Sequence, residues 1–367
     1  MFKFRKMLQS PEQDEVNETK PNTSKSRKFP FEIVPVESSI KTELLHYFHG
    51  ERTGFVQVGP EKYFFPNKYA TEAEKYYNFE ARSDDVWVAS FPRSGTTWTQ
   101  ELVWLVANDL DFETARKQLL TERFPFFEFP VFVHPQIKAE LLEENHFDKQ
   151  KMEFVEQMSQ PGYEVLSKVD ASSRRFIKTH FPFSLLPPSI MEKNSKVIYI
   201  ARNPKDVAVS FYHLNRLYRT QGYVGDFARY WTYFEEGLNP WMPYFSHLKE
   251  ALAVHHLPNV LFLRYEDLLN NLSGAINKVA TFLGCQLSAE DIENLANHLN
   301  ISNFRMNQSV NGHEMADVGV LKSGESGFIR KGLQGMHQEF SDFPELEERV
   351  DNWIRENGSE MVCWESL

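Results

Sequence analysis

Short apolar runs alternate with longer amphipathic stretches along most of the chain. Four of these runs, at 86–90, 175–180, 197–202 and 260–265, are rich in β-branched and aromatic residues and have the length of buried strands. Amphipathic stretches follow the first and the third run and predict helices. Continuous apolar strands that alternate with helices are typical of βαβ units. We therefore expect an α/β fold, with a central parallel β-sheet flanked by helices in a single domain.

The chain has no obvious internal boundary after its N-terminal segment. Residues 9–29 are polar and contain too few apolar side chains to form a core, so we expect 1–29 to be a disordered leader. Residues 30–367 show no repeat and no long linker, and we expect one folded domain there. No apolar run approaches the roughly 18 residues of a membrane-spanning helix. The N-terminus lacks the features of a secretory signal, and two cysteines suit a reducing compartment, so we expect a cytoplasmic location.

Composition narrows the function further. The chain has 40 Lys and Arg against 51 Asp and Glu, a formal charge of −11, which is unlike a general nucleic-acid binder. Phe is abundant, with 31 residues. These rings either belong to an ordinary core or line an apolar pocket, and composition alone leaves both possibilities open.

The segment between the first strand and its helix has the features of an anion-binding loop. In FPRSGTTW at 91–98, Gly95 permits a tight turn, and the following helix start offers free N–H groups to a negative charge. Arg93 adds a fixed cation, and Thr96 and Thr97 add hydroxyl donors. The pattern differs from the GxxxxGK[ST] nucleotide loop, which weakens a Mg²⁺-dependent ATPase or kinase assignment. A plain βα turn remains the alternative.

Four motifs together resemble those of the sulfotransferase family that uses 3′-phosphoadenosine 5′-phosphosulfate (PAPS). They are PRSGTTW at 92–98, KTHFP at 178–182, ARNPKDVAVSFYH at 201–213 and FIRKGLQG at 328–335. The resemblance spans roughly residues 45–360 and is strongest to the cytosolic, small-molecule branch. The segment at 49–69 is similar to insect members, a group that includes a retinol dehydratase.

The resemblance implies a donor site for PAPS, with PAP as the product and without a metal ion. The expected ligands of the 5′-phosphosulfate are Arg93, Ser94, Gly95, Thr96 and Thr97. Those of the adenine are Trp98, Tyr265 and Phe304, with Ser302 beside them. Those of the 3′-phosphate are Arg202, Ser210, Arg330, Lys331 and Gly332. Without the resemblance, the three aromatic residues are interpreted as core and the basic pair at 330–331 as a solvated loop.

His180 is the expected general base, because a neutral imidazole can accept the proton of an attacking hydroxyl. Residues two apart in a strand project to the same side, so Lys178 is expected beside it, where it stabilises charge on the transferring group. Arg93 is the third expected catalytic residue. The family usually has Lys at this position, and Arg hardly ever gives up a proton, which makes an electrostatic role the expectation.

The aromatic run RFPFFEFP at 123–130 predicts the acceptor pocket. Phe126 and Phe129 match acceptor-lining positions of the family, whereas Phe124 and Phe127 are expected in the core. A phenol, sterol or retinoid-like alcohol suits such a pocket. A retinol-dehydratase-like elimination and a non-catalytic nucleotide or lipophile binder are the alternatives. The family's dimer motif is mostly lost, which leaves the oligomeric state open.

Overall fold

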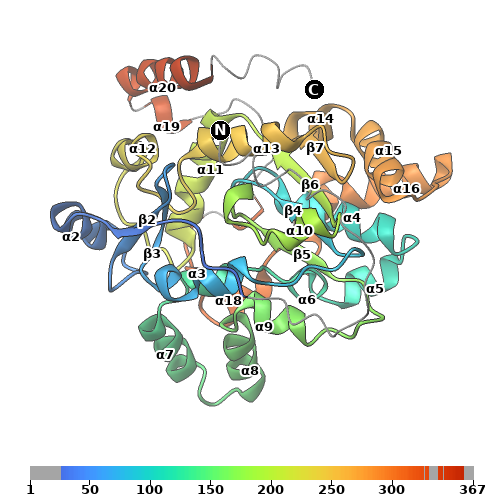
Figure 1. Ribbon diagram of the computed structural model, residues 1–367, viewed down its shortest axis with the longest axis horizontal. Coiled ribbons are helices and arrows are strands. Elements are labelled where there is room, and N and C mark those ends of the chain that lie inside the picture. Colours follow the sequence, from blue (N-terminus) through green and yellow to red (C-terminus); the bar gives the residue numbers. More distant parts are fainter. Residues whose placement is uncertain (1–25, 326, 330–337, 342, 359–367) are drawn as a thin grey trace, which may run out of the picture.

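A four-stranded parallel sheet forms the centre of the computed structural model, which describes residues 26–325, 327–329, 338–341 and 343–358 (Figure 1). The strand order is β5-β4-β6-β7, and each neighbouring pair is parallel. The strands are β4 Val86–Ala89, β5 Phe176–Thr179, β6 Lys196–Ala201 and β7 Val260–Arg264. They coincide with the four runs that the sequence pattern indicates, and the predicted α/β class is confirmed.

All four residues of β4 are buried, which explains why this strand is apolar without interruption. In β4, Val86 and Val88 join a core cluster formed with α4 (Thr96–Ala107), α15 (Leu272–Leu283) and α16 (Ala289–Leu299). Trp87 and Ala89 point to the opposite cluster, which α11 (Pro204–Leu217), α12 (Phe227–Glu235) and α13 (Tyr244–Val254) help to build. The strand therefore divides its side chains between two cores, as the period of a pleated strand requires.

A second, antiparallel sheet was not expected from the sequence pattern. It consists of β1 Ile33–Pro35, β2 Phe55–Val58 and β3 Tyr63–Pro66 in the order β1-β2-β3. All four residues of β3 are buried, so the strand lacks the alternation that marks a strand with one wet face. Its aromatic rings pack into the same core cluster as α11 to α13.

Helices surround the two sheets (Figure 1). Within the described part of the chain, no helix is both long and apolar enough to cross a membrane. The elements are α2 Ser38–Tyr47, α3 Lys68–Tyr77, α4 Thr96–Ala107, α5 Phe112–Lys117, α6 Leu120–Arg123, η1 Phe129–Phe132, α7 Pro135–Glu144, α8 Lys149–Met158, α9 Gly162–Ser167, η2 Phe183–Leu185, α10 Ser189–Glu192, α11 Pro204–Leu217, α12 Phe227–Glu235, α13 Tyr244–Val254, α14 Tyr265–Asn270, α15 Leu272–Leu283, α16 Ala289–Leu299, α17 Ile301–Met306, α18 His313–Asp317, α19 Gln338–Ser341 and α20 Pro344–Gly358.

The end of the expected leader needs a correction. Phe29 packs edge-on against Tyr69 and Tyr77, with ring centroids 6.3 and 5.5 Å apart. Arg27 forms an ion pair with Glu192 at 2.8 Å. Residues 27–29 thus contact the folded domain, because an aromatic ring and an arginine in an otherwise polar segment find partners on α3 and α10. The rest of the expected leader, residues 1–25, lies outside the described residues.

A buried ion pair joins the start of β4 to the start of β5. Arg175 donates from Nε to Asp85 Oδ1 at 2.7 Å and from Nη2 to Asp85 Oδ2 at 2.6 Å. Both side chains are almost fully buried, and the guanidinium also donates to the carbonyl oxygens of Glu80 and Leu166. Bidentate geometry of this kind holds the two strands in register.

Removing one partner of this pair should strongly destabilise the protein. Asp85→Ala leaves the Arg175 guanidinium buried without its counter-ion, and we expect a loss of about 3–5 kcal/mol in the free energy of unfolding. Urea denaturation measures this loss. Glu113→Ala is the control, because Glu113 pairs with Lys117 on an exposed helix face and its loss should change little. Equal midpoints for the two variants would contradict the prediction.

Candidate active site

The loop between β4 and α4 is held in an unusual backbone conformation. Gly95 precedes the first residue of α4 with φ +100°, and a Cβ there would lie 2.6 Å from Tyr265 Cδ2. Glycine is therefore required both by the backbone and by the close ring. Arg93 also has positive φ, at 70°, which is rare for a residue with a side chain. Such strain is typical of ligand-binding loops.

Residues that follow three different strands meet at the carboxyl edge of the sheet. Arg93 Nε donates to Ser210 Oγ of α11 at 2.9 Å, and Arg202 Nη1 donates to the Arg93 carbonyl at 3.2 Å. The Arg202 guanidinium also lies over the Tyr265 ring, 4.2 Å from its centroid. The structure thus brings Arg93, Gly95, Arg202, Ser210 and Tyr265 together.

Two polar atoms at this edge suit an anionic ligand. Among the described residues, neither Ser94 Oγ nor Arg202 Nε has a hydrogen-bond partner, although both atoms are buried. A buried donor without a partner is costly, so a ligand with acceptor oxygens would satisfy both. The N–H groups at the start of α4 add further donors beside a positively charged pair of arginines. These groups fit the phosphate and sulfate oxygens of a nucleotide such as PAPS.

The expected adenine residues are gathered around one core cluster. Trp98, Tyr265 and Phe304 are all buried in the cluster that includes α4 and α15. The Trp98 and Tyr265 rings meet edge-on with centroids 5.9 Å apart, and Trp98 Nε1 donates to the Leu299 carbonyl. Ser302 lies on α17 with an exposed side chain. Arg330, Lys331 and Gly332 lie outside the described residues, and Thr97 is half-buried at the start of α4.

His180 and Lys178 face the same aromatic ring, at the end of β5. Lys178 Nζ lies 4.2 Å from the centroid of the Phe126 ring, and the His180 ring meets Phe126 edge-on at 5.0 Å. The expectation that both side chains project to one side of the strand agrees with these contacts. The backbones of the two segments also pair, since Phe127 N donates to the Lys178 carbonyl at 2.8 Å.

The surroundings of His180 keep its imidazole neutral. Burial lowers its pKa well below 6.5, and the neighbouring Lys178 cation lowers the pKa further. His180 Nδ1 lies 2.8 Å from the Ser90 carbonyl oxygen, which can only accept a hydrogen bond. The proton therefore sits on Nδ1, and Nε2 keeps the lone pair that a general base needs.

Burial also changes the titration of Lys178. It lowers the pKa of this amine to about 8, while the nearby Glu128 carboxylate raises it and Arg93 lowers it. The amine is thus still protonated at neutral pH. A cation held this way interacts more strongly with a neighbouring anion than a solvated one would.

Aromatic rings line the space next to His180. Phe126 and Phe129 lie 5.6 Å apart, and Phe129 contacts Tyr218 edge-on at 6.1 Å. Trp241 meets the His180 ring at 5.4 Å and lies parallel to Phe126 at 6.3 Å. Phe124 and Phe127, the other two rings of the run, are buried in the two core clusters, as the sequence pattern predicts.

Three further residues of the site were missed in the sequence. Ser90 links the loop to the imidazole, because its Oγ lies 2.7 Å from Thr96 Oγ1 and 3.2 Å from His180 Nδ1. Glu128 and Trp241 contact the His180 segment. Glu128 has a recognisable signal, since it is the only carboxylate in an aromatic run, whereas no sequence motif marks Trp241.

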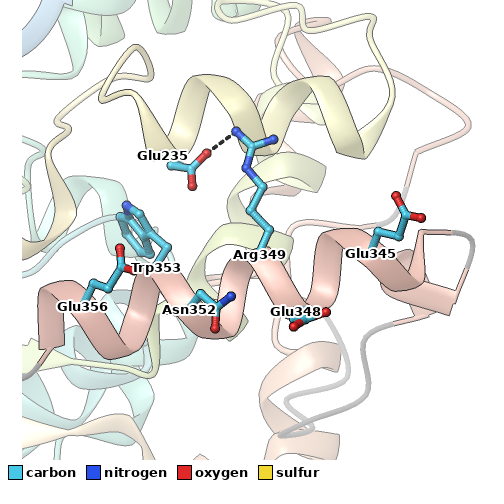
Figure 2. A pocket seen from close by; sticks show the side chains of 7 residues that line it. All are labelled: Glu235, Glu345, Glu348, Arg349, Asn352, Trp353 and Glu356. Carbon is cyan, nitrogen blue, oxygen red and sulfur yellow. Dashed lines mark hydrogen bonds and ion pairs between the residues drawn. The ribbon is translucent and has the colours of Figure 1, made fainter.

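A hollow on the described part of the surface lies away from these residues. It is a cavity of about 350 Å³ between α12 and α20 (Figure 2), and no predicted site residue lines it. Its walls are mostly acidic, and Arg349 reaches across to Glu235. Among the described residues, no group of three or more His, Cys, Asp or Glu side chains could hold a metal ion.

Comparisons with known proteins agree with this arrangement. A family model described as a sulfotransferase domain matches residues 83–362. The luciferin sulfotransferase of Photinus pyralis is 34% identical over 316 residues, which cover 84% of this chain and 81% of the relative. Sulfotransferase 1B1 of Canis lupus familiaris is 32% identical over 267 residues, covering 73% of this chain and 81% of the relative.

The fold is also similar to those of solved structures. The crystal structure of retinol dehydratase in complex with retinol and PAP superimposes with a TM-score of 0.83 and 38% identity, and the match covers 90% of this chain and 97% of that one. A second structure of retinol dehydratase, with androsterone and the inactive cofactor PAP, gives 0.82. A domain match over most of the chain, together with relatives above 30% identity, shows that this chain belongs to the sulfotransferase family and is a PAPS-dependent transferase.

Proposed function

We propose that this enzyme transfers the sulfuryl group of PAPS to the hydroxyl group of a small lipophilic molecule, with His180 as the general base. The observation that carries the proposal is the shared contact of His180 and Lys178 with Phe126, beside the aromatic lining that Phe129 and Trp241 continue. The related retinol dehydratase binds retinol and androsterone, which are flat, apolar molecules. A phenol, sterol or retinoid-like alcohol is the corresponding acceptor here.

The donor site follows from the loop and the two arginines. In this proposal Arg93, Ser94, Gly95, Thr96 and Thr97 hold the 5′-phosphosulfate. The Ser94 hydroxyl, which has no hydrogen-bond partner in the described part of the chain, supports this role. The 3′-phosphate binds Arg202 and Ser210, together with Arg330, Lys331 and the Gly332 backbone. The adenine lies against Trp98, Tyr265 and Phe304, and Ser302 lies beside it.

The residues near the transferring group have separate roles in the reaction. When bound, PAPS supplies the sulfuryl group and leaves as PAP. The acceptor oxygen forms a bond to sulfur as the bond between sulfur and the 5′-phosphate oxygen breaks, and the hydroxyl proton goes to His180 Nε2. Lys178 and Arg93 stabilise the negative charge around sulfur. Positioning and charge stabilisation supply most of the rate in transfers of this type.

Labelled sulfate transfer to a panel of phenols, sterols and retinoids tests this proposal. We expect at least one lipophilic alcohol to become a stable labelled sulfate ester. The likeness to retinol dehydratase favours one specific alternative, in which the ester of an allylic alcohol loses sulfate and yields a dehydrated polyene. Mass spectrometry of the product separates the two outcomes. Binding of PAP without transfer to any acceptor would instead indicate a non-catalytic binder.

Replacing His180 should abolish transfer while the donor site persists. His180→Ala removes the proton acceptor, and we expect the turnover number to fall by about 10²–10⁴-fold. PAP affinity, measured by calorimetric titration, should stay close to that of the wild type, because the imidazole bonds to Ser90 and not to the arginines. Turnover equal to that of the wild type would remove His180 from the mechanism.

The value of kcat/KM should decrease above about pH 8. Lys178 is a cation below its pKa of about 8 and loses its charge as the pH rises through that value. His180 is already neutral in this range, because its pKa is well below 6.5. We therefore expect kcat/KM to fall above about pH 8 in a profile measured from pH 6 to 10. Lys178→Arg should move this fall to higher pH, since a guanidinium stays charged.

A further inference from the structure

Glu128 is a buried carboxylate at the centre of the site, with no role in the transfer described above. Its side chain is fully buried. Oε1 accepts hydrogen bonds from the His180 backbone N–H at 2.6 Å and from Trp241 Nε1 at 3.1 Å. Oε2 accepts one from the Thr179 hydroxyl at 2.9 Å. Among the described residues, Glu128 has no ion-pair partner within 4 Å.

Burial of a carboxylate costs free energy, because the group loses its hydration. The burial of Glu128 therefore indicates that this side chain has a function. A carboxylate without an ion-pair partner loses much of its hydration energy, and an apolar side chain would fill the same space more favourably. Burial raises the pKa of Glu128 to about 7, although its hydrogen bonds with His180, Thr179 and Trp241 oppose the rise. The group is therefore mostly ionised at pH 8.

The hydrogen bonds of Glu128 fix the peptide that carries the base. His180 N–H is held by Glu128, and the His180 carbonyl accepts from His247 Nε2 at 2.9 Å. His247 is itself oriented by the Tyr199 hydroxyl at 2.8 Å, and burial lowers its pKa to about 4, so it is neutral. The same Glu128 oxygen that holds His180 also holds the acceptor-pocket ring of Trp241.

Glu128 lies beside the segment that carries Lys178, because it accepts hydrogen bonds from Thr179 and His180, and the backbone N–H of its neighbour Phe127 donates to the Lys178 carbonyl at 2.8 Å. The charge of Glu128 therefore acts on the Lys178 amine. The charged groups that face this amine are Glu128, from the segment before η1, and Arg93, from the loop before α4. Glu128 raises the pKa of Lys178, and Arg93 lowers it. On its other side Glu128 faces two buried tyrosines of α3, Tyr69 and Tyr76, whose pKa values it helps to raise, so neither carries charge.

We propose that Glu128 is a positioning residue of the transfer reaction. It holds the His180 peptide and the Trp241 ring in one arrangement, and its negative charge keeps Lys178 protonated at the pH of the reaction. The proposal rests on the proposed roles of His180 and Lys178. It predicts that the acceptor pocket and the catalytic pair are aligned by a single carboxylate.

The decisive variant is Glu128→Gln, which keeps the shape and removes the charge. We expect the alkaline fall of kcat/KM to move to lower pH by about one unit or more, since an adjacent opposite charge shifts a pKa by that amount. The turnover number below that pH should fall by about tenfold, because the amide presents one oxygen where the carboxylate has two. Glu128→Asp should keep the alkaline fall near pH 8 while turnover drops, which separates charge from positioning.

Glu250→Gln is the matched control. Glu250 is a half-buried carboxylate that also has three donors, namely Ser184 N–H, the Ser184 hydroxyl and the Tyr63 hydroxyl. Glu250 is not among the charged groups that shift the pKa of Lys178. The control should lose stability to a similar degree but keep the position of the alkaline fall, so a purely structural effect of Glu128 would make the two variants alike.

A measurement that needs no turnover separates this proposal from the proposed function. The ¹³Cε resonance of Lys178 in lysine-labelled protein, assigned with Lys178→Arg, reports its titration directly. We expect the midpoint to move down in Glu128→Gln even if no acceptor is known. An unmoved midpoint overturns the proposal for Glu128, whereas a moved midpoint in an enzyme that transfers no sulfate overturns only the proposed function.

A variant that keeps the Glu128 side chain covers the case in which Glu128→Gln does not fold. Thr179→Val removes one donor to Glu128, which raises the pKa of the carboxyl further above about 7 and weakens its charge at pH 8. The Lys178 midpoint should then move down by a smaller step. A midpoint identical to that of the wild type contradicts the proposal.

Discussion

The properties of this site depend on one physical constraint, which is that three of its ionisable side chains are buried away from water. Lys178, His180 and Glu128 lie together among aromatic rings at the end of β5, and burial changes the pKa of each one. In bulk water the three groups would hold their ordinary charges and interact weakly. The surrounding core therefore keeps the imidazole neutral and makes the Lys178 cation interact strongly with neighbouring charges.

The parallel sheet makes this concentration of charge possible. The carboxyl ends of β4, β5, β6 and β7 lie along one edge, so loops that are far apart in the sequence converge there. Arg93 and Arg202 follow β4 and β6, which are neighbours, and bond to each other through the Arg93 backbone. A chain with a formal charge of −11 thus gathers local positive charge at this edge of the sheet.

The sequence predicted the local geometry of the loop after β4 and of the pair Lys178 and His180, because each consists of residues close together along the chain. Gly95, with its positive φ, and the alternation of Lys178 and His180 follow from local backbone rules. Trp241 and the Ser90 carbonyl were missed because their roles arise only when distant segments pack together. The three-stranded sheet was missed for a related reason, since β3 is buried on both sides and shows no alternation. Residues 27–29 were assigned to a leader because composition cannot reveal single contacts such as that of Phe29 with Tyr77.

Phe126 contacts both Lys178 and His180, and these contacts limit which side chains can replace it. One ring touches the Lys178 amine, the His180 imidazole and the lining residue Phe129. Any substitution of Phe126 that reshapes the pocket also alters the hydration of the amine and the support of the base. The Phe129 ring in turn contacts the Tyr218 ring. If the proposed acceptor binds here, its preference is therefore changed more easily at Phe129 and Tyr218 than at Phe126, which also contacts Lys178 and His180.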